Sequence, residues 1–333
     1  MFSDITLFLN DFLNYIKYVI RGAEFLLNSV DKRIGFIIIF IFGTIFGSFV
    51  NVLIYRLPLE MDFIFKSSFC PKCENPIKWY HNIPLISYII LKGRCYYCKE
   101  KISVQYPIVE FISGLVFGLL YLKFGITWDF FVLALFYIIS LPVIFIDFKY
   151  QIIPDELTIG GIVIGLILAL LRSLLSFQLD SSISLGIFDS LIAIIVNVLI
   201  FIIIYYLSFF IYKKEGMGFG DVKLSATIGA FLGVYPSLIS FFFSFLFGSI
   251  LGLVIMIINK LINYKKINLL KKYVFSSGDY LSTISIIYVV KTDIDKKNSV
   301  YIAFGPFMIL GAWLAIFFTN FILDTFFFTE IGF

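Results

Sequence analysis

The sequence is dominated by apolar stretches of roughly 20 residues, the length at which an α-helix crosses a lipid bilayer. Eight such stretches can be marked out, at residues 34–55, 108–123, 129–147, 159–176, 188–212, 224–238, 239–259 and 302–322. The sixth and seventh run together and are divided only by Tyr235-Pro236. So many apolar runs need a bilayer around them. We therefore predict an all-α polytopic membrane protein with about eight transmembrane helices.

The amino-acid composition excludes several classes of protein and of catalytic mechanism. Apolar residues make up 60% of the chain and charged residues 14%, whereas a soluble domain carries about 25% charged residues. With a mean hydropathy of +1.00, the chain is expected to be neither a water-soluble globule, nor a disordered chain, nor a nucleic-acid-binding protein. The single histidine, His81, excludes mechanisms that need two imidazoles, such as HExxH zinc hydrolysis. We read His81 as a packing or surface residue.

Lysine and arginine set the predicted orientation, because positive charge marks the cytoplasmic side of a membrane protein. Twenty of the 26 basic residues lie in segments 56–107, 148–158, 213–223 and 260–301. With eight spans, all four segments fall on one side. The opposite segments 124–128, 178–187 and 323–333 hold none. Four basic residues before the first span run against this scheme. We predict that the large loops are cytoplasmic and that both termini are external.

These boundaries divide the chain into predicted domains. Apolar residues at helical spacing in 1–33 indicate an amphipathic helix on the membrane surface; a short frayed tail is the alternative. The first span, 34–55, leads to a cytoplasmic tetracysteine domain at 56–107. A helical membrane domain covers 108–322, with an extended cytoplasmic loop at 260–301 in which a small hairpin is expected. Residues 323–333 form an external tail.

The four cysteines form two pairs, CxxC–x21–CxxC. Two thiolates on a tight turn can reach one ion, and two such turns complete a tetrahedral zinc shell. Pro71 and Gly93 suit the turns, and nearby lysines offset the negative charge. A cytoplasmic location disfavours disulfides. We predict a structural zinc site; unmetallated thiols or two labile disulfides are the alternatives. The predicted ligands are Cys70, Cys73, Cys95 and Cys98.

Two aspartates are expected to lie at one depth on the cytoplasmic face. Asp147 closes the third span, and Asp221 follows three alternating glycines immediately before the sixth. Paired carboxylates share a proton, so that one activates water while the other protonates a carbonyl oxygen, which is aspartic-protease chemistry. The alternative is that both aspartates have only structural roles, Asp147 at an interfacial helix end and Asp221 as a helix N-cap. Asp155 and Glu156 are rival carboxylates, which we read as capping the fourth span.

Several segments together resemble the type IV prepilin peptidases, which combine leader peptidase and N-methyltransferase activities. They are GSFVNVLIYRLP (47–58), FCPKC, IKWYHNIPLISYIILKGRCYYC, ISVQYPIVE (102–110), IDFKYQIIPDELT (146–158), GMGFGDVKLSATIGAFLG (216–233) and AFGPFMILGA (303–312). The resemblance covers roughly residues 43–322. Residues 1–33 and the length of 260–301 depart from the family pattern.

This resemblance implies a GxGD-type aspartic endopeptidase of the bacterial inner membrane, with Asp147 and Asp221 as its catalytic pair. Its substrates would be type IV prepilins or pseudopilins, cut after a glycine that follows a basic leader. The new N-terminal residue would then be methylated from S-adenosylmethionine. Methylation follows from the resemblance alone, because no Gly-rich donor fingerprint is visible. Glu110 is a candidate contact for the new amine, although it also suits a helix start.

Other readings of the same residues stay open. The chain could be a peptidase without methylation, or a scaffold that docks prepilin machinery through its zinc domain. A further alternative, outside the enzymes, is an ion- or proton-coupled transporter that binds its cargo with Asp147 and Asp221. That reading needs polar residues continued through the bilayer, whereas the spans are nearly uniformly apolar.

Overall fold

The computed structural model describes residues 31–64, 66–175, 186–213, 217–277 and 303–326, with isolated positions at 11, 15, 18, 19 and 22. The predicted surface helix at 1–33 and the tail at 323–333 fall mostly outside these residues. The described elements are α2 (Lys32–Arg56), η1 (Leu57–Leu59), η2 (Trp79–His81), α3 (Ile86–Ile90), α4 (Gln105–Phe124), α5 (Trp128–Tyr150), α6 (Asp155–Leu175), α7 (Ile187–Tyr212), α8 (Phe219–Leu232), α9 (Val234–Ser277) and α11 (Gly305–Phe326).

The predicted helical membrane fold is confirmed, and a helix overlaps each of the eight predicted spans. Within the described residues, six helices are long and apolar enough to cross a membrane. The shorter ones are α8, with 14 residues, and the apolar part of α11, Gly305–Phe318. At about 1.5 Å per residue α8 spans about 21 Å, less than the roughly 30 Å of a hydrocarbon core.

The boundary between the sixth and seventh predicted spans was misplaced. Helix α8 ends at Gly233, whose φ of 77° a residue with a side chain rarely adopts. Pro236 does not divide two helices, because it lies in the first turn of α9. In that turn the missing N–H of proline has no helical partner to lose. The glycine, rather than the proline, therefore separates the two elements.

Helices α2 and α4 pack against each other through small residues. A Cβ atom on Gly43 would lie 2.7 Å from the Ser113 carbonyl oxygen, and one on Gly47 would lie 2.8 Å from the Glu110 Cα. Gly114 meets α2 in the same way from the opposite side. Small residues at a helix interface let two backbones approach closely inside a membrane. This pair consequently anchors both ends of the segment that carries the cysteines.

Helix α5 lies in the buried hydrophobic core of the described residues. Its Phe136 ring lies 5.3 Å from the ring of Phe231 on α8 and 5.7 Å from that of Trp313 on α11. Most of α5 is buried, and α8 lies between α6 and α7. Because protein surrounds α8 on several sides, this short helix does not need to span the hydrocarbon on its own.

Helix α9 continues far beyond its apolar part. Its 44 residues correspond to about 66 Å at 1.5 Å per residue, whereas the membrane-capable part is Val234–Ile257. The segment 260–301, predicted as a loop, therefore begins as an extension of α9 to Ser277. The hairpin expected in its second half lies outside the described residues.

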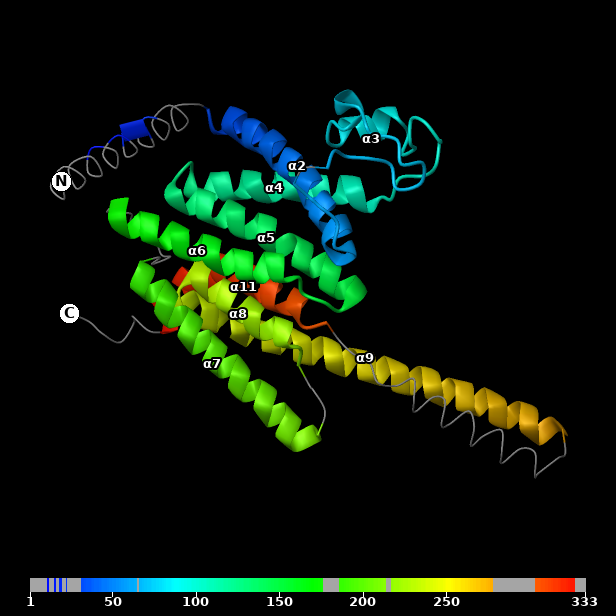
Figure 1. The fold of residues 1–333 in the computed structure, drawn as a ribbon. Coiled ribbons are helices and arrows are strands. Elements are labelled where there is room, and N and C mark those ends of the chain that lie inside the picture. The colour runs from blue at the N-terminus through cyan, green and yellow to red at the C-terminus, as the bar shows by residue number, and fades with distance from the viewer. Residues whose placement is uncertain are drawn as a thin grey trace.

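The helix ends that carry the predicted site residues lie at one end of the bundle. Figure 1 shows the C-terminal end of α5 and the N-terminal ends of α8 and α11 close together, with the cysteine-containing segment around α3 at the same end. The predicted cytoplasmic connections after α2, α5 and α7 all lie there. Their shared position agrees with the alternation inferred from the basic residues.

Candidate active site

Asp147 lies one turn before the end of α5 and is 5% exposed. Helix α5 ends at Gln151, which has left-handed backbone angles and donates its N–H to the Asp147 carbonyl oxygen. The Asp147 side chain points to another helix: its Oδ2 accepts a hydrogen bond of 3.0 Å from the backbone N–H of Gly305, the first residue of α11. A helix N-terminus offers free N–H groups and a positive field to such a carboxyl group.

Asp221 lies in the first turn of α8 and is 7% exposed. The helix N-cap is Gly218, not Asp221, and the Asp221 carboxyl group accepts a hydrogen bond from the Gly218 backbone. Gly216, the first glycine of the motif, lies outside the described residues. Each of the two carboxyl groups is therefore buried and held by a backbone N–H at the start of a helix. That helix is α11 for Asp147 and α8 for Asp221.

Ile153 shows how closely the two aspartate-bearing regions approach. Ile153 lies between α5 and α6. A Cβ on Gly220 would be 3.1 Å from the Cβ of Ile153. A Cβ on Gly305 would be 3.3 Å from the Ile153 Cδ1 and 2.6 Å from the Asp147 Oδ2. The carboxyl groups of Asp147 and Asp221 are close enough to interact electrostatically. The structure therefore brings these two predicted residues together, although sequence reasoning missed the contribution of Gly305.

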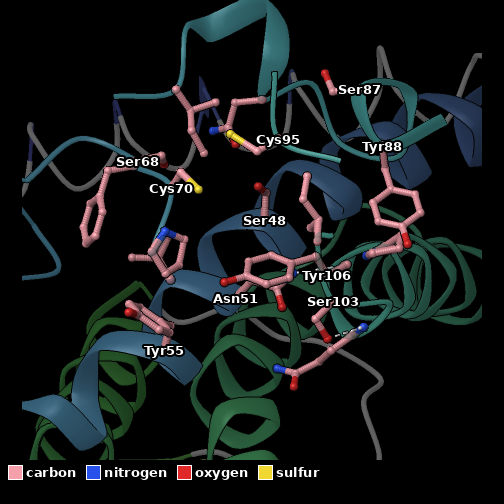
Figure 2. A pocket seen from close by; sticks show the side chains of 18 of the residues that line it. Ser48, Asn51, Tyr55, Ser68, Cys70, Ser87, Tyr88, Cys95, Ser103 and Tyr106 are labelled. Carbon is pink, nitrogen blue, oxygen red and sulfur yellow. Dashed lines mark hydrogen bonds between the residues drawn. The ribbon is translucent and has the colours of Figure 1, made fainter. Parts of the chain in front are cut away.

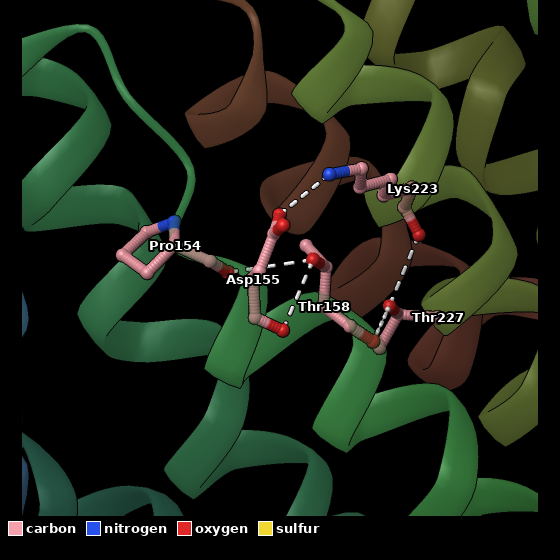
Figure 3. Close-up of polar contacts among 5 residues, drawn as sticks. All are labelled: Pro154, Asp155, Thr158, Lys223 and Thr227. Carbon is pink, nitrogen blue, oxygen red and sulfur yellow. Dashed lines mark hydrogen bonds and ion pairs between the residues drawn. The ribbon is translucent and has the colours of Figure 1, made fainter.

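The rival carboxylates have structural partners. Asp155 begins α6, is exposed, and pairs with Lys223 of α8 at 2.6 Å. Figure 3 shows this ion pair beside Thr227, whose hydroxyl donates to the Thr158 carbonyl oxygen at 2.9 Å. These contacts join the N-terminal end of α6 to the middle of α8. Asp155 and Glu156 both lie in the first turn of α6, where negative charge is favoured.

The four cysteines form a compact cluster, with all four sulfur atoms within 4.8 Å of one another. The Sγ atoms of Cys70 and Cys98 are 3.9 Å apart, and those of Cys73 and Cys95 are 4.0 Å apart. A tetrahedral ion with Zn–S bonds of about 2.3 Å separates its sulfur ligands by about 3.8 Å. The donor set and its spacing therefore fit a metal ion of this kind.

Two matching turns build the cluster. In each, the residue after the second cysteine donates its N–H to the carbonyl oxygen of the first: Glu74 to Cys70 at 2.8 Å and Lys99 to Cys95 at 3.1 Å. Glu74 and Lys99 both have positive φ, 56° and 60°. Gly93, which was expected to suit the second turn, also has a positive φ of 65°. The positive φ values at Glu74 and Lys99, which follow the second cysteine of each pair, were not predicted from the sequence.

Backbone hydrogen bonds prepare two thiols to bind a cation. The backbone N–H of Asn75 holds the pKa of Cys73 below its ordinary value. Burial raises the pKa of Cys95, but hydrogen bonds from the backbone N–H groups of Cys98 and Tyr97 have a larger combined effect. They lower the pKa of Cys95 to about 7. Thiolates are the metal-binding form of cysteine, and a lowered pKa favours that form at both residues.

Two profiles of known families match the chain. Residues 41–124 match the bacterial peptidase A24 N-terminal domain, and residues 130–253 match the type IV leader peptidase family. The chain belongs to the type IV leader peptidase family. The first match contains all four cysteines, and the second contains Asp147 and Asp221. Together with the six membrane-capable helices, membership in this family indicates an integral inner-membrane protein.

Curated relatives carry the name prepilin leader peptidase/N-methyltransferase. The Myxococcus xanthus protein is 32% identical over 59% of this chain and 56% of its own length. The Neisseria gonorrhoeae protein is 31% identical over 58% of this chain and 73% of its own, and the Klebsiella pneumoniae protein is 34% identical over 59% and 84%. The chain thus aligns with little more than half of the Myxococcus protein. No solved structure matches the chain.

In this leader-peptidase chain, buried polar residues attach the cysteine-containing segment to the membrane helices. Arg56, 3% exposed at the end of α2, donates to the carbonyl oxygens of Asp62, Lys66 and Ser67 at 2.7–3.0 Å. Glu110 of α4 accepts a hydrogen bond of 2.8 Å from the Leu85 N–H. Leu85 has φ 60° and ψ −50°, a strained backbone geometry. The described contacts of Glu110 are structural; its predicted contact with a substrate amine stays a prediction.

Proposed function

We propose that this chain is an aspartic endopeptidase that removes the leader from type IV prepilins or pseudopilins, with Asp147 and Asp221 as its catalytic pair. The observation that carries the proposal is the meeting of two buried carboxyl groups, from α5 and α8, at one end of the bundle. They interact electrostatically, and each is held by a backbone N–H. Membership in the leader peptidase family supports the same chemistry.

The proposed mechanism needs one proton shared by the pair. Two carboxyl groups that interact electrostatically at close range cannot both ionise cheaply, so one keeps its proton. The ionised carboxylate accepts a proton from water as the water attacks the scissile carbonyl carbon, while the protonated partner donates to the carbonyl oxygen. The Gly305 N–H fixes the position of the Asp147 carboxyl group. The missing side chain at Gly218, where a Cβ would have nothing closer than the Asp221 Oδ2 at 3.8 Å, leaves room for a substrate backbone beside Asp221.

The substrate follows from the position of the pair. A prepilin keeps a basic leader in the cytoplasm and an apolar helix in the bilayer, so its scissile bond lies at the cytoplasmic membrane face. The basic residues of this chain predict that the end of the bundle with Asp147 and Asp221 faces the cytoplasm. We propose cleavage after the glycine that ends the leader. The printed names of the relatives support prepilins as the substrate class.

We further propose that the chain methylates the new N-terminal residue from S-adenosylmethionine, as the N-methyltransferase in the relatives' names suggests. In this proposal Cys70, Cys73, Cys95 and Cys98 hold a structural zinc ion. Four thiolates leave a tetrahedral ion no open position, so the metal orders the domain and does not enter the reaction. Membership in a peptidase family does not favour the transporter reading.

The test is cleavage of a purified prepilin by the full chain in detergent. We expect Asp147→Asn and Asp221→Asn each to abolish cleavage, and the double variant to be scarcely worse than either, because the two groups act as a unit. An amide nearly matches the size of a carboxyl group but cannot accept the proton of water. Wild-type cleavage should show a bell-shaped pH profile, since one group must be ionised and the other protonated.

Asp155→Asn is the matched control. Its exposed ion pair with Lys223 contributes at most about 1 kcal/mol, so cleavage should stay within a few-fold of wild type. An inactive Asp155→Asn enzyme beside an active Asp147→Asn enzyme would show that the wrong carboxyl group was chosen. Full activity of Asp221→Asn would end the aspartic-protease proposal.

A further inference from the structure

A cavity of about 460 Å³ lies between the cysteine-containing segment and the membrane helices. Figure 2 shows Ser48, Asn51 and Tyr55 of α2 on one wall, Tyr106 of α4 beside them, and Cys70 and Cys95 farther out. Small-molecule sites typically enclose roughly 300–1,000 Å³. The cavity is therefore large enough for a nucleoside-sized ligand, and the peptidase chemistry proposed above makes no use of it.

Two polar atoms that line this cavity lack a partner among the described residues. Asn51 is 3% exposed, and its side-chain nitrogen donates to the Tyr106 carbonyl oxygen at 3.0 Å, while its Oδ1 is buried and unpaired. The Nδ1 of His81 is likewise buried and unpaired. Buried polar atoms are nearly always hydrogen-bonded. Unpaired atoms on a cavity wall indicate a ligand that supplies hydrogen-bonding groups.

The other lining residues indicate what kind of ligand fits. Tyr55, Tyr88 and Tyr106 offer aromatic faces, which attract cations and stack on planar rings. Glu110 adds a carboxyl group inside the cavity, and exposed lysines, including Lys101 and Lys149, stand at its edge. A ligand with an aromatic base, a cationic centre and a terminal carboxylate would find a partner for each part.

We infer that this cavity binds the methyl donor, an adenosyl sulfonium compound, between α2, α4 and the tetracysteine domain. The inference deepens the proposed function, because it rests on the chain being a methyltransferase. In this arrangement Asn51 and His81 bind hydrogen-bonding groups of the nucleoside, and the tyrosines contact its base and the sulfonium. When bound, the donor supplies a methyl group that a neutral amine accepts, with release of a neutral thioether and a proton.

Helix α5 relates this cavity to the aspartates. Phe145 and Lys149, one turn apart, line the cavity, whereas Asp147 is offset from both by about 200° around the helix. The two sites therefore lie on opposite faces of the last turns of α5, separated by about the 10 Å width of a helix. A substrate cut at Asp147 and Asp221 has a short path to travel before its new amine reaches the donor.

The tetracysteine domain forms part of the cavity wall. Cys70, Cys95 and the Tyr96-Tyr97 pair between the second pair of cysteines are among the lining residues. Glu110 holds Leu85 of the same domain against α4. Loss of the metal should therefore disturb donor binding before it disturbs the aspartates, which lie outside this domain.

The test measures binding directly, by equilibrium dialysis of radiolabelled S-adenosylmethionine against the detergent-purified full chain. We expect one saturable site that S-adenosylhomocysteine competes for. Asn51→Leu and Tyr106→Leu should each weaken binding at least 10-fold while thermal stability and zinc content stay near wild type. Tyr206→Leu, at an exposed tyrosine of α7, is the matched control and should bind normally.

The possible outcomes separate this inference from the peptidase proposal. A wild-type chain that cleaves prepilin but binds no donor would overturn the inference alone. Folded cavity variants that bind the donor as tightly as wild type would also overturn it. Displacement of the donor by a basic leader peptide would assign the cavity to the leader instead. Donor binding that the cavity variants weaken, in a chain that does not cleave, would support the inference and remove the peptidase proposal.

Discussion

Replacing Gly305 with alanine tests whether the contact between α11 and Asp147 serves catalysis. The added Cβ would lie 2.6 Å from the Asp147 Oδ2, whereas ordinary contact begins at 3.4 Å, so the carboxyl group must move by about 0.8 Å. The backbone N–H that holds Asp147 is retained in alanine. Misplacing a catalytic group by about 1 Å can cost roughly 100-fold in rate. We therefore expect the kcat for prepilin cleavage to fall by roughly 30- to 100-fold.

The same substitution should leave the fold intact. The nearest atom to the new methyl group is the end of a flexible side chain, and the next is the Ile153 Cδ1 at 3.3 Å. Alanine also favours a helix over glycine by up to about 1 kcal/mol. Single-turnover cleavage and thermal unfolding of the same preparation separate the two effects. Gly160→Ala, where the Cβ meets nothing within 4 Å, is the matched control.

A folded Gly305→Ala enzyme with a near-normal kcat would refute this reasoning. It would mean either that Asp147 tolerates displacement or that the reacting group lies elsewhere. An unfolded variant would show that the contact is structural, because the side chain of Asp147 could not then yield to the methyl group.

The remaining predictions concern the metal and a buried ion pair. Cys70→Ser should release zinc, measured by elemental analysis, and should reduce methylation before cleavage, because metal binding contributes much of the folding free energy of so small a domain; purified wild-type protein with four titratable thiols and no zinc would contradict this. Asp129 of α5 and Arg172 of α6 are 3.1 Å apart, with side chains 3% and 10% exposed, near the other end of α5. Asp129→Asn removes this charged partner from a buried arginine and should lower the free energy of unfolding by up to about 3–5 kcal/mol. Prepilin cleavage at a temperature where the variant stays folded should be near normal, and a specific loss of cleavage would tie this pair to the site.

Local patterns accounted for much of the fold and of the candidate site. Apolar run lengths located the helices, because the bilayer requires about 20 apolar residues per span. The alternation of basic segments placed Asp147 and Asp221 at one end of the bundle, where the structure also has them. The cysteine spacing alone indicated the cluster, since two residues between thiols is the spacing that lets both reach one ion.

What the sequence did not reveal depends on contacts between distant residues. Gly305 approaches Asp147 across 158 positions, and no spacing rule links them. The helix break at Gly233 was assigned to Pro236, because proline is a stronger local signal than a glycine whose φ is known only in the fold. The cavity at Asn51 was missed for the same reason, since its walls come from α2, α4, α5 and the cysteine-containing segment.

The hydrogen bond from Gly305 to Asp147 also has a consequence for how the enzyme is made. Gly305 leaves the ribosome 158 residues after Asp147, which at roughly 5–20 residues per second is a delay of about 8–30 s. During that time α5 and α8 can already be in the membrane, but the Asp147 carboxyl group lacks the donor that positions it. In the proposed mechanism, a nascent chain therefore lacks full proteolytic competence until α11 has been translated and inserted.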